Sequence, residues 1–193
     1  YKSVVDVFDK TGNEVFKTNL VTSRVADVSI SQDSKYLAIA EIDLSGILIK
    51  SSIQIVSIEL AKTNPSQAII NKYEAPTDKM ILNVEYQEQN KLICMYSDGI
   101  ESYEEKTSTE LIKFDDKKES FMTIELSNRV ALVDEISTGE YTANTNIRII
   151  DPNTKKEREY VTGSIAKSIK TSDNKMAINF GTELHLIDKN GIL

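Results

Sequence analysis

One short hydrophobic pattern recurs five times along the chain. It consists of an apolar, a variable and two apolar residues, the third position being Lys113 in one copy, followed by Asp or Ser and then by turn-forming residues. The copies are VDVFD at 5–9, IQIVS at 53–57, LIKFD at 111–115, IRIID at 147–151 and LHLID at 184–188. Because successive side chains of a strand point to opposite faces, alternating apolar positions are typical of β-strands. The pattern therefore predicts five similar strands, each closed by a turn.

The whole chain, including the five copies of this pattern, divides into short predicted strands that are separated by polar, Gly or Pro residues. The predicted strands are Tyr1–Asp9, Glu14–Leu20, Val25–Ser31, Tyr36–Ile42, Ile47–Ile58, Gln67–Glu74, Met80–Tyr86, Lys91–Ser97, Thr109–Phe114, Phe121–Leu126, Arg129–Ile136, Asn146–Ile150, Glu157–Val161, Ile165–Lys170, Lys175–Phe180 and Glu183–Ile187. Successive copies of the repeated pattern end at 9, 57, 115, 151 and 188, so the period averages about 45 residues. A period of this length, built from four short strands, indicates β-propeller blades.

A second recurring stretch places a polar turn before a strand that is apolar at nearly every position. Its copies are SQDSKYLAIA, QEQNKLICMY, SNRVALV and TSDNKMAINF, which start at Ser31, Gln87, Ser127 and Thr171. A continuous apolar run predicts a strand that is covered on both faces. Sheets stacked as propeller blades cover their middle strands in this way, whereas a sheet with one solvated face does not.

We therefore predict an all-β fold, a β-propeller-like array of four-stranded antiparallel blades. About four blades are expected, as part of a larger ring, in one domain or fragment. The predicted segments are a partial blade at 1–24, blades at 25–78, 79–119 and 120–163, and a partial blade at 164–193. Because the chain opens on Tyr1 and both ends fall within a blade, we expect a longer protein, with further blades after Leu193 and any signal or anchor upstream.

Composition narrows the possible partners. Of 193 residues, 40% are hydrophobic, which suits a globular core, and the 30 Asp and Glu outnumber the 23 Lys and Arg for a net charge of −7. Nucleic acid is not an expected partner, because a phosphate-binding surface needs massed basic residues.

The one cysteine, Cys94, lies in an apolar run and is expected to be buried. No segment resembles a membrane span, so no membrane insertion is expected within these residues.

Both recurring stretches resemble segments of a known class of repeat. The pairs that close the five patterns, from Phe8-Asp9 to Ile187-Asp188, stand where WD-repeat proteins carry Trp-Asp, and SQDSKYLAIA resembles a segment of bacterial YVTN/TolB-type propellers. The chain has no Trp and no Gly-His dipeptide, so the hydrogen-bonded tetrad of the eukaryotic WD repeat is absent and the bacterial class is the better match. This resemblance implies a scaffold for binding and does not by itself imply an activity.

The obvious chemical candidates have simpler structural explanations. His185 is the only histidine, and the equivalent positions of other repeats hold unrelated residues, so we expect an incidental strand residue and no catalytic triad or His-based metal site. The recurring aspartates Asp9, Asp115, Asp151 and Asp188 precede turn residues, so we expect them to accept backbone N–H groups. No catalytic residues, metal ligands or cofactor are predicted.

The connections between second and third strands differ most in length, and variable loops on a rigid scaffold are where binding usually occurs. They span 43–52, 98–108 and 137–145, and shrink to 181–182 in the last repeat. The candidate ligand-binding residues on them are Asp43, Asp98, Glu101, Tyr103, Glu104, Glu105, Glu140 and Tyr141. Acidic loops with two tyrosines would suit a basic or carbohydrate-like partner, although solvated loops without a partner would have the same composition. The stretch DGIESYEE lacks the residue spacing of a calcium loop.

These observations favour a non-catalytic binding, scaffolding or sensory propeller whose partner is a protein, peptide or glycan. We expect it to be the outer, extracytoplasmic domain of a bacterial surface or membrane-anchored protein. The alternative is a propeller-type hydrolase or lyase with an acidic or metal-assisted site, against which the scarcity of histidine argues.

Overall fold

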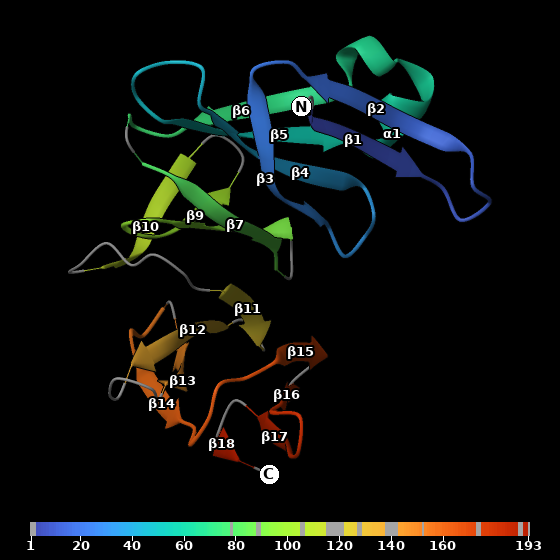
Figure 1. The fold of residues 1–193 in the computed structure, drawn as a ribbon. Helices are drawn as coiled ribbons and strands as arrows, with labels where there is room; N and C mark the ends of the chain where they lie inside the picture. The colour runs from blue at the N-terminus through green and yellow to red at the C-terminus, as the bar shows by residue number, and fades with distance from the viewer. Residues whose placement is uncertain are drawn as a thin grey trace. The chain divides into compact units, whose positions relative to one another are not determined.

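A computed structural model describes residues 3–77, 79–87, 90–104, 107–114, 122–126, 129–137, 143–151, 153–172, 175–188 and 191–192. It is an all-β structure of five small sheets (Figure 1). The chain divides into two compact units, Tyr1–Lys117 and Lys118–Leu193, which are described separately.

The first unit contains three antiparallel sheets, in which strands adjacent in sequence are also adjacent in space. Sheet A pairs β1 (Ser3–Phe8) with β2 (Glu14–Leu20). Sheet B contains β3 (Ser23–Ile30), β4 (Tyr36–Asp43), β5 (Lys50–Ser57) and β6 (Ile69–Glu74). Sheet C contains β7 (Ile81–Tyr86), β8 (Leu92–Tyr96), β9 (Gly99–Glu104) and β10 (Thr107–Lys113).

The second unit contains two further sheets with the same order of strands. Sheet D contains β11 (Met122–Leu126), β12 (Arg129–Ser137), β13 (Ala143–Ile150) and β14 (Glu157–Val161). Sheet E contains β15 (Ser168–Ser172), β16 (Lys175–Asn179), β17 (Leu184–Asp188) and β18 (Gly191–Ile192). Four-stranded antiparallel sheets therefore recur along the chain.

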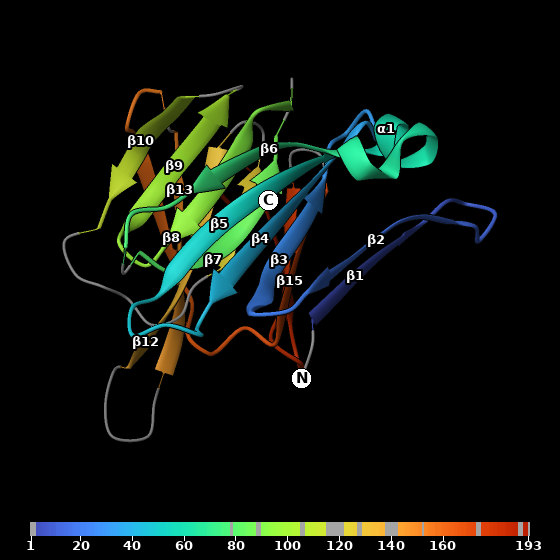
Figure 2. The ribbon, with the colours of Figure 1, turned by 90° about the horizontal axis from the view of Figure 1, so that it is seen from above.

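Two short helical turns were not predicted. In the structure, the predicted strand Ile47–Ile58 is shortened to β5. Helix α1 (Ile58–Thr63) and the 3-10 helix η1 (Pro65–Gln67) follow it, where a loop was predicted. Ser57 caps α1 by accepting a hydrogen bond from the Leu60 N–H at 3.3 Å, which ends the strand and starts the helix. Helix α1 packs beside β2 (Figure 2). Among the described residues, no helix has the length and hydrophobicity needed to cross a membrane.

The prediction that LIKFD marks a third strand was wrong. Leu111–Lys113 belong to β10, the fourth strand of sheet C, and the third strand is Gly99–Glu104. With that correction the third strands of sheets B, C, D and E end at 57, 104, 150 and 188, which are 47, 46 and 38 residues apart. The pattern misled because Leu111 and Phe114 are buried at the end of β10 in the same way as the equivalent residues of the third strands β5 and β13.

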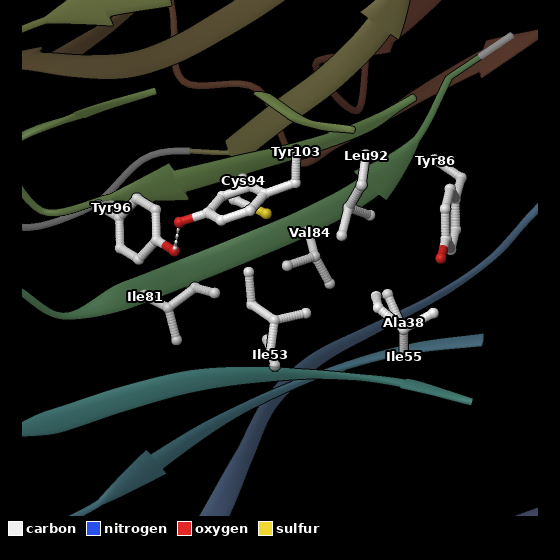
Figure 3. Close-up of a cluster of buried hydrophobic side chains, with 11 residues drawn as sticks. Ala38, Ile53, Ile55, Ile81, Val84, Tyr86, Leu92, Cys94, Tyr96 and Tyr103 are labelled. Atoms are coloured by element: carbon white, nitrogen blue, oxygen red, sulfur yellow. Dashed lines mark hydrogen bonds between the residues drawn. The ribbon is translucent and has the colours of Figure 1, made fainter. Parts of the chain in front are cut away.

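Sheet B is covered on both faces. One face packs on sheet C through a core of Ala38, Ala40, Ile53, Ile55, Ile81, Val84, Tyr86, Leu92, Cys94, Tyr96 and Tyr103 (Figure 3). The other face packs on sheet A and α1 through Phe16, Leu37, Ile39, Val56, Ala61 and Ala68. The middle strands β4 and β8 are buried along their apolar runs, which confirms the prediction that both of their faces are covered. Cys94 is buried, as predicted.

In the second unit, sheets D and E share a core of the same kind. It comprises Ala131, Ile147, Ile149, Ile169, Met176, Ile178, Phe180 and Ile187. Met176, Ile178 and Ile187 have no exposed surface, so this face of sheet E is filled by packing against sheet D.

A buried hydroxyl links consecutive sheets in each unit. The Ser51 carbonyl accepts the Ala75 N–H at 2.9 Å, and the Ser51 Oγ accepts the Ile81 N–H at 3.0 Å, where sheet C begins. In the second unit, the Thr145 carbonyl accepts the Thr162 N–H at 2.9 Å, and Thr145 Oγ1 accepts the Ala166 N–H at 2.7 Å, just before sheet E. The same hydrogen bonds at two equivalent positions show that the units share one repeated design.

We predict that Ser51→Ala lowers the free energy of unfolding by about 1.5 kcal/mol, because the buried Ile81 N–H would lose its acceptor. Chemical denaturation measures this change. The matched control, Ser108→Ala, removes an exposed hydroxyl from β10 and should alter the free energy by less than about 0.5 kcal/mol. Equal effects of the two substitutions would contradict the structural role of Ser51.

Candidate functional site

The candidate site is one end of sheets B and C, which we call the loop face. It consists of residues 21–22, 44–49, 75–77, 79–80 and 97–98. Hydrogen bonds join these segments: Thr22 Oγ1 donates to Asp43 Oδ2 at 3.5 Å, and the Ser97 N–H donates to the Met80 carbonyl at 2.8 Å. Together with the Ser51 hydrogen bonds, they bring connections from distant parts of the sequence to the same end of the unit.

The predicted ligand-binding residues are divided between several places. Asp43 ends β4, while Glu101, Tyr103 and Glu104 lie on β9 and Asp98 precedes it. Glu105, Glu140 and Tyr141 lie outside the described residues. The interpretation of 98–108 as a loop was wrong, because its described residues, 98–104 and 107–108, form the turn into β9, the strand itself and the start of β10. Ile100, Ser102 and Tyr103 are buried there, so only part of this stretch faces solvent.

Asp98, Glu101 and Tyr103 do come together, around a lysine that the sequence did not single out. The Lys79 ammonium forms a short salt bridge with Glu101 and lies 3.5 Å from Asp98 Oδ1. It also lies 4.7 Å from the centre of the Tyr96 ring, which is a cation–π contact. The side chains of Lys79 and Glu101 are only 13% and 15% exposed, so the salt bridge is largely shielded from water.

Two tyrosines continue this network into the core. Tyr103 Oη donates to Glu101 Oε2 at 2.9 Å, and the hydroxyls of Tyr96 and Tyr103 lie 2.6 Å apart (Figure 3). The Tyr103 ring packs on Tyr73 of β6, with 4.6 Å between ring centres. The network therefore connects sheet C to the edge of sheet B as well as to the loop face.

The protonation states of this network suit ion pairing better than acid–base catalysis. Burial alone would lower the pKa of Lys79, but the hydrogen bond that its ammonium donates to Glu101 and the charges of Glu101 and Asp98 outweigh burial and raise this pKa above its usual value. Burial raises the pKa of both Tyr96 and Tyr103 far above 10. At neutral pH the lysine is therefore a cation and both tyrosines keep their protons, so neither type of group is poised as a base.

Asp98 is the member of the network that faces outward. Its side chain is 42% exposed, yet its Oδ1 is buried and accepts no hydrogen bond from the described residues; the 3.5 Å approach of Lys79 is an ion pair without hydrogen-bond geometry. The Asp98 carbonyl accepts the Phe114 N–H at 2.9 Å, which corresponds to the hydrogen bond from Ala75 to Ser51. Asp98 thus presents a carboxylate at the loop face from a rigid backbone position.

An apolar tip is the most exposed part of the loop face. The connection between β4 and β5 carries Leu44, Ile47 and Leu48, which are 54%, 102% and 48% exposed, and the neighbouring turn carries Val21 at 76%. Ile47 and Leu48 had been assigned to a strand, but β5 begins only at Lys50. The run of aliphatic residues around Gly46 in an otherwise turn-like sequence was the signal that could have identified this tip.

Asp43 holds the base of this tip and remains ionised. Its Oδ1 accepts the Ser45 N–H at 2.8 Å, while its Oδ2 accepts from Thr22. The hydrogen bonds from Ser45, together with the charge of Lys50, lower the pKa of Asp43. The carboxylate therefore shapes the turn and adds negative charge beside the exposed aliphatic side chains.

Asp9 and Asp151 accept backbone N–H groups in their turns, as predicted. Asp9 Oδ1 accepts from the Thr11 hydroxyl and from the Thr11 and Asn13 N–H groups, and these hydrogen bonds lower its pKa to about 2. Asp151 Oδ1 accepts the Asn153 and Thr154 N–H groups, which lower its pKa as well. Asp115 lies outside the described residues. The described Asp, Glu, His and Cys residues contain no group of three that could hold a metal ion.

His185 has a more specific place than the incidental strand position that we expected. Its Nδ1 lies 2.6 Å from the Tyr160 Oη of β14, and its Nε2 lies 3.1 Å from Glu183 Oε2. The imidazole also packs edge-on against Phe180, with 4.8 Å between ring centres. His185 therefore bridges sheets D and E, a role that depends on packing between sheets and has no sequence signal.

The comparison with protein families gives one result. The model of DUF5711, described as a family of unknown function, matches residues 2–193. The chain belongs to this family. A comparison with curated proteins found no match. The DUF5711 match spans both units, so the apolar tip, the Lys79 network and the His185 bridge all lie within the region that defines the family.

Proposed function

We propose that this DUF5711 chain is a non-catalytic binding or sensory domain of the β-propeller type, and that it binds a protein, peptide or glycan at the loop face. The observation that carries the proposal is the apolar tip on the loop face, with the Asp43 carboxylate at its base and the partly exposed Asp98 carboxylate on the same face. Exposed aliphatic side chains on a turn gain nothing in folding stability, whereas they gain from being covered by a partner. Carboxylates at the rim add preference for a basic or hydroxyl-rich partner.

The support beneath the loop face is rigid, as a binding site requires. The tip projects from β4 and β5, whose apolar residues are packed on both faces. Asp98 and Glu101 are fixed by Lys79, and Glu101 also by Tyr103. A preorganised surface loses little conformational entropy on binding, which favours affinity.

Three features support the propeller arrangement. Sheet B lies between sheets A and C, face to face, as a blade lies between its neighbours. Sheets B to E are four-stranded meanders, and their third strands end 47, 46 and 38 residues apart. The hydrogen bonds of Ser51 and Thr145 tie each sheet to the next one in the same way in both units. A structure determination that found a two-sheet sandwich would contradict this arrangement.

The resemblance to bacterial propellers also carries our proposal for location. We place the domain outside the cytoplasm, as the outer domain of a bacterial surface or membrane-anchored protein. Nucleic acid is not a proposed partner, since the chain carries a net charge of −7.

A ligand screen tests the proposed function. Thermal-shift measurements with basic peptides, glycans and divalent metal ions identify compounds that stabilise the protein, and titrations then give their dissociation constants. We expect a peptide or glycan to stabilise the wild type, and Ile47→Ser/Leu48→Ser to weaken its binding about tenfold, as truncation of interface anchors typically does.

The matched control is Ile69→Ser/Ile70→Ser. These residues lie on β6 and are 47% and 48% exposed, so the control removes comparable apolar surface away from the tip. Binding that is equally strong in the tip variant and the wild type would place the ligand elsewhere. Stabilisation by a metal ion together with turnover of a peptide or glycan would support an enzyme instead.

A further inference from the structure

The composition of the loop face distinguishes between the classes of partner that could bind there. Its described residues include two charged side chains, Lys79 and Asp98, and no aromatic one. Aliphatic side chains dominate the exposed part, because Leu44, Ile47 and Leu48 of the apolar tip are 54%, 102% and 48% exposed. The loop face is therefore mainly aliphatic, although the chain as a whole is acidic.

The exposure of the apolar tip does not come from an unpaired strand. Residues 44–49 join β4 to β5, the two middle strands of sheet B, and each of these strands is paired on both edges. Sheet C covers one face of this hairpin, and sheet A with α1 covers the other. The tip lies beyond Asp43 and Lys50, the last residues that pair in the hairpin, so its side chains remain exposed beside a complete framework.

A glycan would find little on this face of what sugar binding requires. Sugar hydroxyls need free hydrogen-bonding groups, and an exposed aromatic ring commonly packs on the C–H face of a sugar. Tyr96 and Tyr103 are only 1% and 7% exposed, and their hydroxyls lie against each other in the core (Figure 3). The hydroxyls of Thr22 and Ser97 already take part in hydrogen bonds within the protein. Aliphatic side chains of a polypeptide match the tip better than a hydroxyl-rich sugar does.

The Lys79 network leaves a negative charge on the loop face. Its single ammonium lies against two carboxylates, those of Glu101 and Asp98. Glu101 is 15% exposed and makes the closer salt bridge, whereas Asp98 is 42% exposed and lies further from the ammonium. The charge that the lysine does not balance therefore faces solvent at Asp98. A lysine or arginine of a partner would complement it.

We infer that the occupant of the loop face is a polypeptide segment whose aliphatic side chains cover the apolar tip and whose lysine or arginine pairs with Asp98; the inference rests on the proposed function, whose site it shares. Covering apolar surface supplies most of the affinity. The exposed ion pair adds little affinity but sets the preference for a basic segment, since an acidic one would bring like charges together.

The test selects peptides without assuming their sequence. A phage-displayed library of random linear peptides is panned on the full chain, and the selected peptides are synthesised and titrated by calorimetry. We expect them to be enriched in Leu, Ile or Val together with Lys or Arg. Ile47→Ser/Leu48→Ser should weaken their binding about tenfold. Because all four exchanged side chains are small or exposed, circular dichroism of this variant should match the wild type.

A double-mutant cycle tests the ion pair. Asp98→Asn should weaken binding about threefold, and replacement of the basic residue of the peptide with glutamine should weaken it to the same extent. The two changes together should cost no more than either alone, because both remove the same interaction. Glu110→Gln removes an exposed carboxylate from β10 of the same sheet and should leave the affinity unchanged.

The outcomes separate this inference from the proposed function. Selection of acidic or purely polar peptides, additive effects in the cycle, or tip-dependent binding of cello- or chito-oligosaccharides would overturn the assignment to a basic aliphatic segment and leave the loop face as a binding site. Binding that survives both the tip substitutions and Asp98→Asn would place the ligand elsewhere and overturn both. Selection of no peptide, with no oligosaccharide bound, would also overturn both.

Discussion

Replacement of Lys79 with methionine is expected to lower the free energy of unfolding by about 3 kcal/mol. The lysine is largely buried, and its charge offsets that of Glu101 and Asp98. Methionine keeps the length and the packing of the side chain on Tyr96 but leaves a shielded carboxylate without its counter-ion. Denaturant unfolding monitored by circular dichroism measures the loss.

A double-mutant cycle separates the ion pair from simple packing. Glu101→Gln keeps the acceptor for Tyr103 Oη and removes the negative charge. Lys79→Met/Glu101→Gln should therefore be more stable than Lys79→Met alone, because it no longer carries an uncompensated shielded charge. If the double variant loses as much as the two single variants together, the two residues do not interact and the proposed network is wrong.

Replacement of Gly99 with alanine is expected to destabilise the protein by about 3 kcal/mol, at the upper end of the range for overpacking. A Cβ at this position would lie 2.3 Å from the Ile112 carbonyl oxygen and 3.3 Å from the Lys113 Cα. Both are backbone atoms of β10, which pairs with Gly99, so relief requires the strands to separate. The same unfolding measurement applies, and amide exchange in β9 and β10 should increase.

The matched control for this substitution is Gly163→Ala. A Cβ on Gly163 would meet no atom within 4 Å, so the added methyl should change the free energy of unfolding by less than about 0.5 kcal/mol. A tolerated Gly99→Ala would show that β9 and β10 are not paired as described. It would also restore the original interpretation of residues 98–108 as a loop.

Local chemistry explains the parts of the fold that were predictable. Asp9 and Asp151 accept hydrogen bonds from backbone N–H groups that lie at most four residues further along the chain, so the turn sequence was enough to assign their role. The apolar runs in β4 and β8 were enough to predict strands covered on both faces, since burial follows from composition. Strand β9 was missed because buried polar and aromatic residues interrupt its alternation, and helix α1 because six residues carry little periodicity.

The candidate site was predictable only in part. Asp98, Glu101 and Tyr103 were selected as exposed acidic and aromatic loop residues, yet Glu101 and Tyr103 are held inside a network. Their partner Lys79 comes from the connection before β7, and its approach depends on how β7, β8 and β9 pair. The apolar tip was overlooked because its residues have high strand propensity, and propensity does not reveal where pairing stops.

By itself, the sequence determined the all-β class, the recurring strands, the turn aspartates and the buried middle strands, because each depends on residues close together in the chain. Only the tertiary structure decided which strand is third in sheet C, which charges meet at Lys79, and that His185 bridges two sheets. Strand pairing and the contacts between particular side chains join segments that are distant in the sequence, and short patterns of residues do not encode which segments meet.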